Sequence, residues 1–490
     1  MIGWKELRNV PQMLSLVEQQ AENRVLIRYL HGMDVIEVTA TDFFSHVRQY
    51  ALFLQTQGLA GCHIGMIGAN SYHWLVSFCA VLDVGGIAVL FSPDLNSDEL
   101  AERALQVDLQ GLIYEDSLFE NGSLVNLSPE IAQIPMRAPA DSPPVHSSQP
   151  VPVRSPDDPA CILFTSGTTA KCKAVVLSHQ AILAGACNNV IGLPFEAQLA
   201  ILPFHHIAGL STTLNALWLG AVVCIAENVK QLYRCLSKLK PDYVLTVPSL
   251  LEAIVKKLKS GGVHGSRLGW NLRIIACGGA RFPNHVIDVI RSQDIHILQG
   301  YGATETGGLG FYWEMSPDCP YTIGKPCPGL EAKLIDGELF LKSTAVMLGY
   351  YGDPSATAQV LRDGWYATGD LGYVDAQGCY HLTGRKKNLI ILSNGENVSP
   401  EEIEEKLSTC PQIREVLVLE KDQKICAVIY PGESAEDQDA GNLERIRRAV
   451  AAYNRSVPLY KQVQMAEFVC SPLPKTPAGK IIRYHHAGGS

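Results

Sequence analysis

Short apolar runs alternate with amphipathic stretches through the middle of the chain. Each run is only four or five residues long, which is the length of a buried strand. The intervening stretches repeat apolar residues at helical spacing, and this alternation is typical of parallel sheets covered by helices. The predicted strands are 65–69, 87–91, 111–114, 161–164, 174–177, 200–203, 222–226, 243–247, 273–276 and 295–299, and the clearest predicted helices are 97–106, 229–239 and 249–260.

The pattern changes to hairpins after about residue 321. Strand candidates there are 338–342, 371–374 and 379–383, with a turn at 375–378 between the last two. These short, regularly spaced strands predict a β-rich subregion of the large domain, and they leave Asp370 in a loop.

A smaller unit follows Lys387. Ser399, Pro400 and Glu402 predict a capping box at the start of its first helix. The expected fold is therefore α/β, with a large multi-sheet N-terminal domain and a small mobile α+β C-terminal domain. The other elements predicted for the C-terminal domain are strands 413–419 and 424–430 and a helix at 443–455.

The stretch 206–226 carries no charged residue apart from histidine and is about long enough to cross a membrane. Its glycine, serine, threonine and asparagine residues predict instead a buried helix followed by a strand at 221–226. The chain start has no basic region followed by an apolar core, so we expect neither a signal peptide nor a transmembrane segment. Fourteen cysteines without a CxxC pair suggest reduced thiols in a cytoplasmic protein.

Composition narrows the class of protein. A chain of 490 residues with 47% hydrophobic and 18% charged residues can bury several cores. The net charge of −9 argues against nucleic acid as a partner. It does not exclude a local basic site for phosphates.

Residues 164–173, FTSGTTAKCK, form a candidate phosphate loop after a predicted strand. Backbone N–H groups and hydroxyls would donate to phosphate oxygens, glycine would allow close approach, and lysine would neutralise charge. The spacing does not fit a Walker A loop, and taken alone such a run can also be a solvated turn. The candidate ligands are Thr165, Ser166, Gly167, Thr168, Thr169 and Lys173.

The segment 164–175 resembles the signature YTSGTTGKPKGV of the adenylate-forming (AMP-binding) enzyme family, in its acyl-CoA synthetase branch. Six further motifs of that family follow in the family's order, which makes chance agreement negligible. The first 150 residues add only a compatible βαβ pattern. The six motifs are Gly278-Gly279-Ala280, 299–305 (QGYGATE), 368–370 (TGD), 384–387 (GRKK), 395–398 (GENV) with Pro400 and Glu404, and 474–480 (PKTPAGK).

This resemblance implies an ATP site. Tyr301 would stack on adenine in a slot shaped by Gly279 and Ala280. Asp370 would accept hydrogen bonds from both ribose hydroxyls, with Arg385 supporting it.

The resemblance also assigns the catalytic residues. Thr304 would offer its hydroxyl to the α-phosphate, and Glu305 would supply the hard oxygen ligand that Mg²⁺ prefers. Lys480 would steady the charge that moves between the carboxylate and the α-phosphate. Lys387 would be the hinge between an N-terminal domain, 1–386, and a mobile C-terminal domain, 388–490.

Three residues depart from the family signature. Ala170, Cys172 and Ala174 stand where glycine, proline and glycine are usual. Loss of two glycines restricts φ and adds methyl groups near phosphate. We expect altered kinetics rather than inactivity, and we expect glycine at 170 and 174 to preserve or raise adenylation.

The segment 202–210, LPFHHIAGL, resembles the substrate wall of acyl- and aryl-CoA synthetases, with His206 at the wall; the alternative is a packed pair of His205 and His206. The segment has no acidic residue to pair with a substrate ammonium, so we expect a fatty or aromatic acid rather than an amino acid. Only ten residues follow Lys480, so the acyl acceptor should be a separate molecule, coenzyme A or a free-standing carrier protein. A catalytically weakened acyl-AMP or nucleotide sensor is the non-enzyme alternative.

Overall fold

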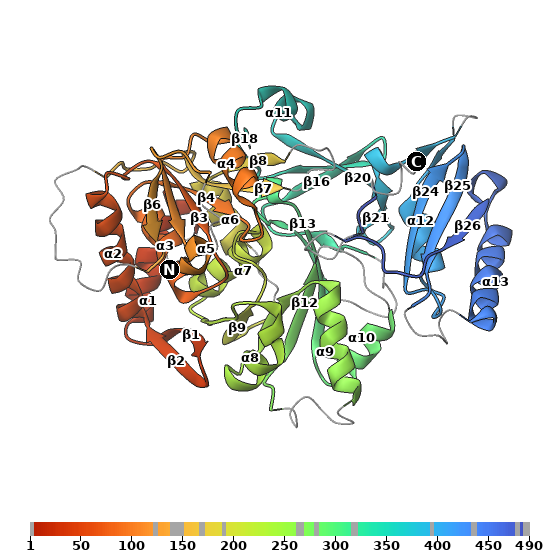
Figure 1. Cartoon of the computed structure of the whole chain (residues 1–490), viewed down its shortest axis with the longest axis horizontal. Coiled ribbons are helices and arrows are strands. Elements are labelled where there is room, and N and C mark those ends of the chain that lie inside the picture. The colour runs from red at the N-terminus through yellow and green to blue at the C-terminus, as the bar shows by residue number, and fades with distance from the viewer. Residues whose placement is uncertain are drawn as a thin grey trace.

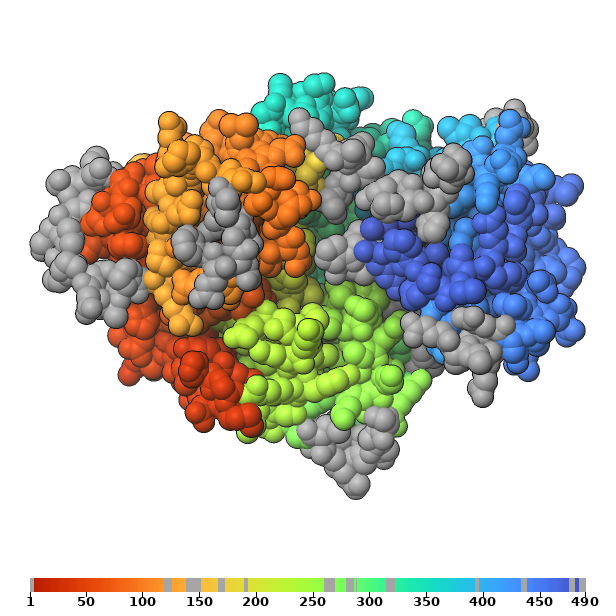
Figure 2. Space-filling model, in the orientation of Figure 1, coloured from red at the N-terminus to blue at the C-terminus, as the bar shows by residue number. Residues whose placement is uncertain are grey.

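A computed structural model describes residues 4–120, 126–137, 151–165, 172–188, 193–260, 269–278, 284–314, 322–392, 396–432, 439–475 and 481–483. The molecule is elongated, with the C-terminal unit at one end (Figure 1). Figure 2 shows the same arrangement at the surface, where the last part of the chain, coloured blue, lies at one end of the molecule.

The first large sheet has seven strands in the order β18-β8-β7-β4-β3-β5-β6. Five neighbouring strands, β7 to β6 in that order, are parallel, and β8 and β18 add antiparallel pairs at one edge. The strands are β3 (His63–Ile67), β4 (Ile87–Phe91), β5 (Gly111–Tyr114), β6 (Ala132–Pro135), β7 (Pro159–Thr165), β8 (Lys173–Ser178) and β18 (Gly349–Tyr350).

The second large sheet has nine strands in the order β15-β14-β13-β12-β11-β9-β10-β1-β2. Its six inner strands are parallel, whereas β2, β14 and β15 are antiparallel at the edges. The strands are β1 (Val25–His31), β2 (Asp34–Thr39), β9 (Ala197–Ala200), β10 (Val222–Ile225), β11 (Tyr243–Thr246), β12 (Ile274–Gly278), β13 (His296–Gly302), β14 (Gly310–Glu314) and β15 (Lys325–Pro326).

Helices pack between and around these sheets. One apolar core contains residues of both sheets, for example Leu90 and Val223, together with helix residues such as Phe43, Phe78 and Leu214. The helices are α1 (Val10–Ala21), α2 (Ala40–Thr56), α3 (Tyr72–Asp83), α4 (Ser97–Gln106), α5 (Asp116–Glu120), α6 (His179–Asn188), α7 (Ile207–Trp218), α8 (Leu232–Lys238), α9 (Pro248–Ser260) and α10 (Asn284–Arg291).

A third, antiparallel sheet forms the β-rich subregion. β17 pairs with β16 and β20, and β20 pairs with β19 and β21. The elements are β16 (Glu331–Ile335), β17 (Glu338–Lys342), α11 (Pro354–Val360), β19 (Leu361–Arg362), β20 (Trp365–Val374) and β21 (Tyr380–Arg385).

The C-terminal unit has its own apolar core, in which Ile403 of α12, Val418 of β24 and Ile446 of α13 are buried. Its main sheet has three strands. The elements are β22 (Ile390–Ile391), β23 (Asn397–Val398), α12 (Pro400–Leu407), β24 (Glu415–Lys421), β25 (Lys424–Tyr430), α13 (Ala440–Ser456) and β26 (Met465–Phe468). The α/β architecture with a small α+β unit is therefore confirmed.

Several local predictions are wrong. The strand expected at 200–203 is β9, three residues earlier, because the backbone at Leu202 bonds to a side chain instead of a neighbouring strand. Asp370 lies inside β20, not in a loop, since β17 and β21 pair with β20 around it. The long uncharged stretch is α7 followed by β10, as predicted. No described helix is long and apolar enough to cross a membrane.

The predicted capping box is also wrong. Ser399 is the N-cap of α12 and Pro400 occupies the first turn, but the Ser399 hydroxyl donates to the carbonyl of Thr383 at 2.7 Å. Glu402 forms an ion pair with Lys461 at 2.9 Å. The serine therefore ties the start of α12 to β21 instead of satisfying its own helix.

Candidate active site

A buried carboxylate joins two sheets at the centre of the candidate site. Asp370 is 5% exposed. The hydroxyl of Tyr301, at the end of β13, donates to its Oδ2 at 2.6 Å, and Nε of Arg385 lies 2.8 Å from its Oδ1. Asp370 and Arg385 are cross-strand partners in the β20–β21 hairpin. The structure thus brings together the three residues to which sequence analysis assigned the nucleoside.

The charges of this group support one another. Burial and then the negative charge of Asp370 raise the pKa of Tyr301 well above its usual value, so its hydroxyl stays protonated and donates. Burial disfavours the charge on Arg385, but Asp370 and other negative charges outweigh it and raise its pKa. A carboxylate has about four acceptor positions, and the described residues occupy two of those on Asp370. The remaining two match the two hydroxyls of a ribose.

Residues outside the predicted set hold the carboxylate in place. The Thr368 hydroxyl accepts the N–H of Asp370 at 3.0 Å. Glu338 accepts the N–H of Gly369 at 3.2 Å and pairs with Lys386 at 2.7 Å. Thr368 and Lys386 belong to sequence motifs, but Glu338 belongs to none, because it lies in β17, a separate strand.

A second group lies at the end of the seven-stranded sheet. The ammonium of Lys173, the first residue of β8, is 4.5 Å from the ring centre of Tyr350. The Tyr350 hydroxyl donates to Oε1 of Glu305 at 3.1 Å. Burial and the charge of Glu305 raise the pKa of Tyr350, so it too remains a donor. Tyr350 therefore connects the predicted phosphate-binding lysine to the predicted magnesium ligand, a link that the sequence did not reveal.

Tyr366 lies near both groups. It is 6% exposed and sits on β20, four residues before Asp370. Burial raises its pKa first, and the negative charge of Glu305 raises it further. Tyr366 precedes the predicted strand 371–374 and belongs to no motif, so the sequence did not identify it.

The two ends of the predicted phosphate loop lie on neighbouring antiparallel strands. Thr165 and Lys173 are paired across β7 and β8, and the Cys172 thiol lies 2.8 Å from the carbonyl of Thr165. Thr304 begins a short 3₁₀ helix, Thr304–Thr306, just after β13. Several predicted residues lie outside the described part of the chain: Ser166, Gly167, Thr168, Thr169, Ala170, Gly279, Ala280 and Lys480.

One of the three departures from the family signature is not in the loop. Ala174 is the second residue of β8, pairs with Phe164 of β7 and is 1% exposed in an apolar core. The expectation that Ala174 lies in the phosphate loop is therefore wrong, whereas the effect of glycine at 170 and 174 on adenylation stays a prediction. Strand pairing already fixes the backbone at Ala174, and the methyl group is part of the core.

The predicted acyl wall is anchored by a residue that the sequence did not identify. Asn70, which follows β3, donates to the Leu202 carbonyl at 2.9 Å and accepts the Phe204 N–H at 2.8 Å. Its side chain is buried, and these bonds fix the segment that leads to His205 and His206. The sequence gave no signal for this contact because 132 residues separate Asn70 from Leu202.

The two histidines are in contact. Their ring centres lie 4.3 Å apart, and His206 is the N-cap residue of α7. Burial lowers the pKa of His205 to about 3. His206 keeps an exposed surface, yet enough protein surrounds it that desolvation lowers its pKa, while the charge of Asp94 raises it. Asp94 comes from the segment after β4, so an acidic group that was not expected lies near this wall.

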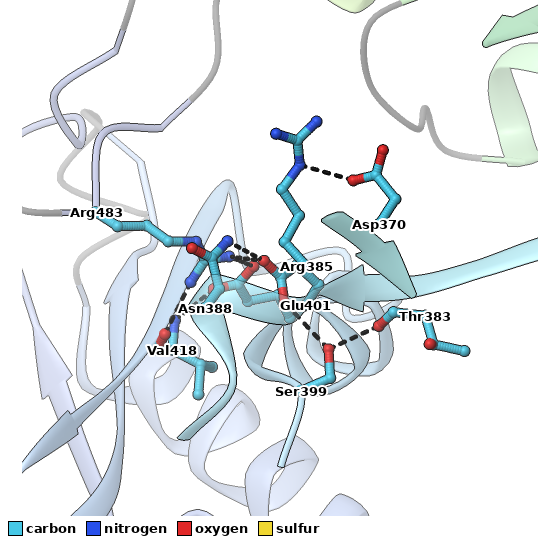
Figure 3. A network of polar contacts seen from close by, with 9 residues as sticks. Asp370, Thr383, Arg385, Asn388, Ser399, Glu401, Val418 and Arg483 are labelled. Carbon is cyan, nitrogen blue, oxygen red and sulfur yellow. Dashed lines mark hydrogen bonds and ion pairs between the residues drawn. The ribbon is translucent and has the colours of Figure 1, made fainter. Parts of the chain in front are cut away.

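The predicted hinge lies between the two units. Lys387 is the middle residue of a 3₁₀ helix, Lys386–Asn388, directly after β21. Figure 3 shows Asn388 beside Glu401 of α12 and Ser399 beside Thr383 of β21. Side-chain contacts from α12 therefore reach both the hinge and the last strand of the large domain.

Metal-binding geometry is sparse. In the described part of the chain, no group of three or more histidine, cysteine or carboxylate side chains could hold a metal ion. A magnesium ion that accompanies a nucleotide needs one or two carboxylates beside the phosphates. Glu305, next to Tyr350 and near Lys173, meets that smaller requirement.

Comparison with known proteins agrees with this geometry. Residues 16–351 match the family model described as AMP-binding enzyme, and residues 387–487 match that of the AMP-binding enzyme C-terminal domain. A 2-succinylbenzoate–CoA ligase of Listeria innocua is 31% identical over 66% of this chain and 68% of its own length. A fatty acid–[acyl-carrier-protein] ligase of Mycobacterium marinum is 28% identical over 96% of each chain.

The fold has a close counterpart among solved structures. The O-succinylbenzoate coenzyme A synthetase of Bacillus subtilis, in complex with AMP, superposes with a TM-score of 0.82 and 22% identity, over 99% of this chain and 98% of the other. The two sheets, the β-rich subregion and the small C-terminal unit therefore form a known architecture.

Proposed function

The chain belongs to the AMP-binding enzyme family, and we propose that it is an AMP-forming acid–thiol ligase. It would use ATP to convert a small fatty or aromatic carboxylic acid to an acyl adenylate, and then transfer the acyl group to a thiol, that of coenzyme A. The relatives named above ligate carboxylic acids to coenzyme A or to an acyl carrier protein, and similarity covers both units of this chain.

The observation that supports this function best is the buried Asp370, held by Tyr301 and Arg385. A carboxylate with two acceptor positions that no described residue uses, next to an aromatic ring at a strand end, suits a ribose and its base. The phosphates would then extend towards Glu305 and Lys173, which Tyr350 links to each other, since Glu305 lies only four residues after Tyr301 in the chain.

Each predicted residue then has a defined task. Tyr301 would stack on adenine in a slot shaped by Gly279 and Ala280, and Thr165 to Thr169 with Lys173 would bind the outer phosphates. Thr304 would donate to the α-phosphate, and Lys480 would steady the charge there as the acid attacks. Glu305 would hold the magnesium ion, which supplies neutralising charge for the phosphates.

The acyl acceptor can be coenzyme A or a carrier protein. We infer coenzyme A, but the relative similar over 96% of each chain ligates a fatty acid to an acyl carrier protein. A separate carrier protein is therefore the alternative acceptor, and a catalytically weakened acyl-AMP sensor is the alternative outside the enzymes.

A pyrophosphate-release assay over a panel of acids tests the function. The panel holds fatty, aromatic and amino acids, since Asp94 lies near His206. Each active acid is then offered coenzyme A or a phosphopantetheinylated carrier, and thioester is measured. Acid-dependent pyrophosphate release with transfer to coenzyme A is expected. Release of no pyrophosphate with any acid, together with tight acyl-AMP binding, would instead identify a sensor.

A further inference from the structure

Arg483 anchors the end of the described chain to the C-terminal unit. Its Nη2 lies 2.6 Å from Oε2 of Glu404 and 3.3 Å from Oε1 of Glu401, and Nη1 donates to the carbonyl of Val418 at 3.0 Å (Figure 3). Oε1 of Glu404 accepts the N–H of Val418 at 2.7 Å. Arg483, Glu404 and Val418 therefore form a closed ring of polar contacts that joins the chain end to α12 and β24.

This ring suits an arginine. The guanidinium is a rigid fork of donors, so one side chain can reach a carboxylate and a carbonyl at once, which a lysine cannot do in the same geometry. The side chains of Arg483 and Glu404 are 27% and 16% exposed. Burial raises the pKa of Glu404 to about 7, although the positive charge of Arg483 opposes this rise. The arginine therefore favours the charged form of its own partner.

Two fixed stems flank the segment that precedes Arg483. Ile481 pairs with Lys475 in an antiparallel bridge, and the N–H of Ile482 donates to the Pro474 carbonyl at 2.8 Å. On the other side, Nζ of Lys475 forms an ion pair of 2.5 Å with Glu415 of β24. Residues 476–480 connect these stems, and Lys480 directly precedes Ile481.

The helix that holds Arg483 is itself held against the large domain. Glu401 accepts the amide of Asn388 at 2.5 Å, in the 3₁₀ helix of the predicted hinge. Ser399 donates to Thr383, two residues before the Arg385 that pairs with Asp370. In this arrangement of the two units, these contacts place the anchor point of Arg483 next to the strand that carries Arg385.

We propose that Arg483 is a positioning residue for acyl-adenylate formation, which fixes the stem after Lys480 so that the lysine reaches the α-phosphate. The inference rests on the proposed function, because it assigns to Arg483 an effect that acts through Lys480. Arg483 is held in place mainly by the Glu404 carboxylate, and also by Glu401 and the Val418 carbonyl.

The test measures the two half-reactions separately in the full-length enzyme. Arg483→Gln is expected to lower the rate of acyl-adenylate formation about 10- to 100-fold, because small misplacements of a catalytic group cost this much. The KM values for ATP and acid should change less than about twofold, since Arg483 contacts neither. Thioester formation from preformed acyl-AMP should be unchanged, and Arg483→Lys should recover part of the first rate.

A matched control distinguishes positioning from general stability. Lys461→Gln removes another ion pair of α12, between Lys461 and Glu402 at 2.9 Å. It should leave both half-reactions unchanged. If Lys461→Gln slows adenylation as much as Arg483→Gln does, or if Arg483→Gln slows both half-reactions equally, the inference is wrong.

A double variant tests whether Arg483 acts through Lys480. In Lys480→Ala, the further change Arg483→Gln should slow adenylation no more than about twofold, since there is no lysine left to position. Multiplying losses would overturn the inference and leave the proposed function standing. No loss in Lys480→Ala alone would refute the proposed role of Lys480 and the inference with it.

Discussion

Asp370→Asn is expected to weaken ATP binding about 10- to 150-fold. The substitution keeps the shape of a side chain that is 5% exposed, and its remaining carbonyl oxygen can still accept the Tyr301 hydroxyl. It removes the charged acceptor that we assign to the ribose. A hydrogen bond to a charged group contributes about 1.5–3 kcal/mol, which corresponds to this range of binding constants.

Asparagine is preferable to alanine because Asp370 is buried beside Arg385. Removing one partner of a buried ion pair and its volume together can cost about 3–5 kcal/mol of stability. The sequence placed Asp370 in a loop, where alanine would be tolerated, but the residue lies in β20. Asp375→Asn is a matched control, since it removes a carboxylate paired with His381 at 2.8 Å in the same hairpin.

The assay compares ATP with 2′-deoxy-ATP and 3′-deoxy-ATP by equilibrium binding. The wild-type protein and the Asp375→Asn variant should bind both deoxy nucleotides more weakly than ATP. The Asp370→Asn variant should bind all three about equally, because the acceptor for the missing hydroxyl is already absent. If Asp370→Asn still discriminates between ATP and the deoxy nucleotides as the wild type does, Asp370 does not bind the ribose.

Four further outcomes are expected. Lys387→Pro fixes φ near −65° and removes an N–H, so single-turnover assays should show one half-reaction surviving and the other largely lost, and two unaffected rates would exclude a hinge at this residue. Ala174→Gly should lower the free energy of unfolding in urea by about 1–2 kcal/mol, because it loses a buried methyl group and loosens a strand; unchanged stability would contradict the assignment to the core. Burial lowers the pKa of His205 from 6.5 to about 3, so the stability that depends on its neutral form is complete above pH 6.5 and is lost as the pH falls towards 3. In urea titrations, the free energy of unfolding of His205→Asn should therefore fall less steeply with acid than that of the wild type. Identical pH dependences would refute this. Asn70→Ala leaves the buried carbonyl of Leu202 and the N–H of Phe204 unpaired, so it should raise the KM for the acid more than the KM for ATP. An equal rise in both KM values would show that Asn70 does not act on the acyl wall.

Local patterns predicted the elements whose identity depends on neighbouring residues. The strands at 87–91, 111–114, 338–342 and 424–430 and the helix at 97–106 have the predicted bounds. Each is a short segment whose apolar run or helical spacing is visible in its own residues. The prediction failed at β9, where contact with Asn70 rather than hydropathy decides where the strand ends.

The candidate site divides in the same way. The order of motifs identified Tyr301, Asp370 and Arg385, and the structure brings these three together. It did not identify Tyr366 or Tyr350, because a tyrosine in a strand has the same local pattern whether it faces a core or a site. Their role depends on Glu305, which is 45 residues from Tyr350 along the chain.

By itself, the sequence determined the α/β class, the C-terminal unit and the residue types available for binding a nucleotide. Only the tertiary structure decided which partner each polar group has. Ser399 was expected to cap its own helix, but its hydroxyl donates to the carbonyl of Thr383 in β21, a strand of the β-rich subregion. Helix and strand patterns arise from interactions within a few residues, whereas a buried polar side chain is satisfied by whatever partner the fold brings within hydrogen-bonding distance.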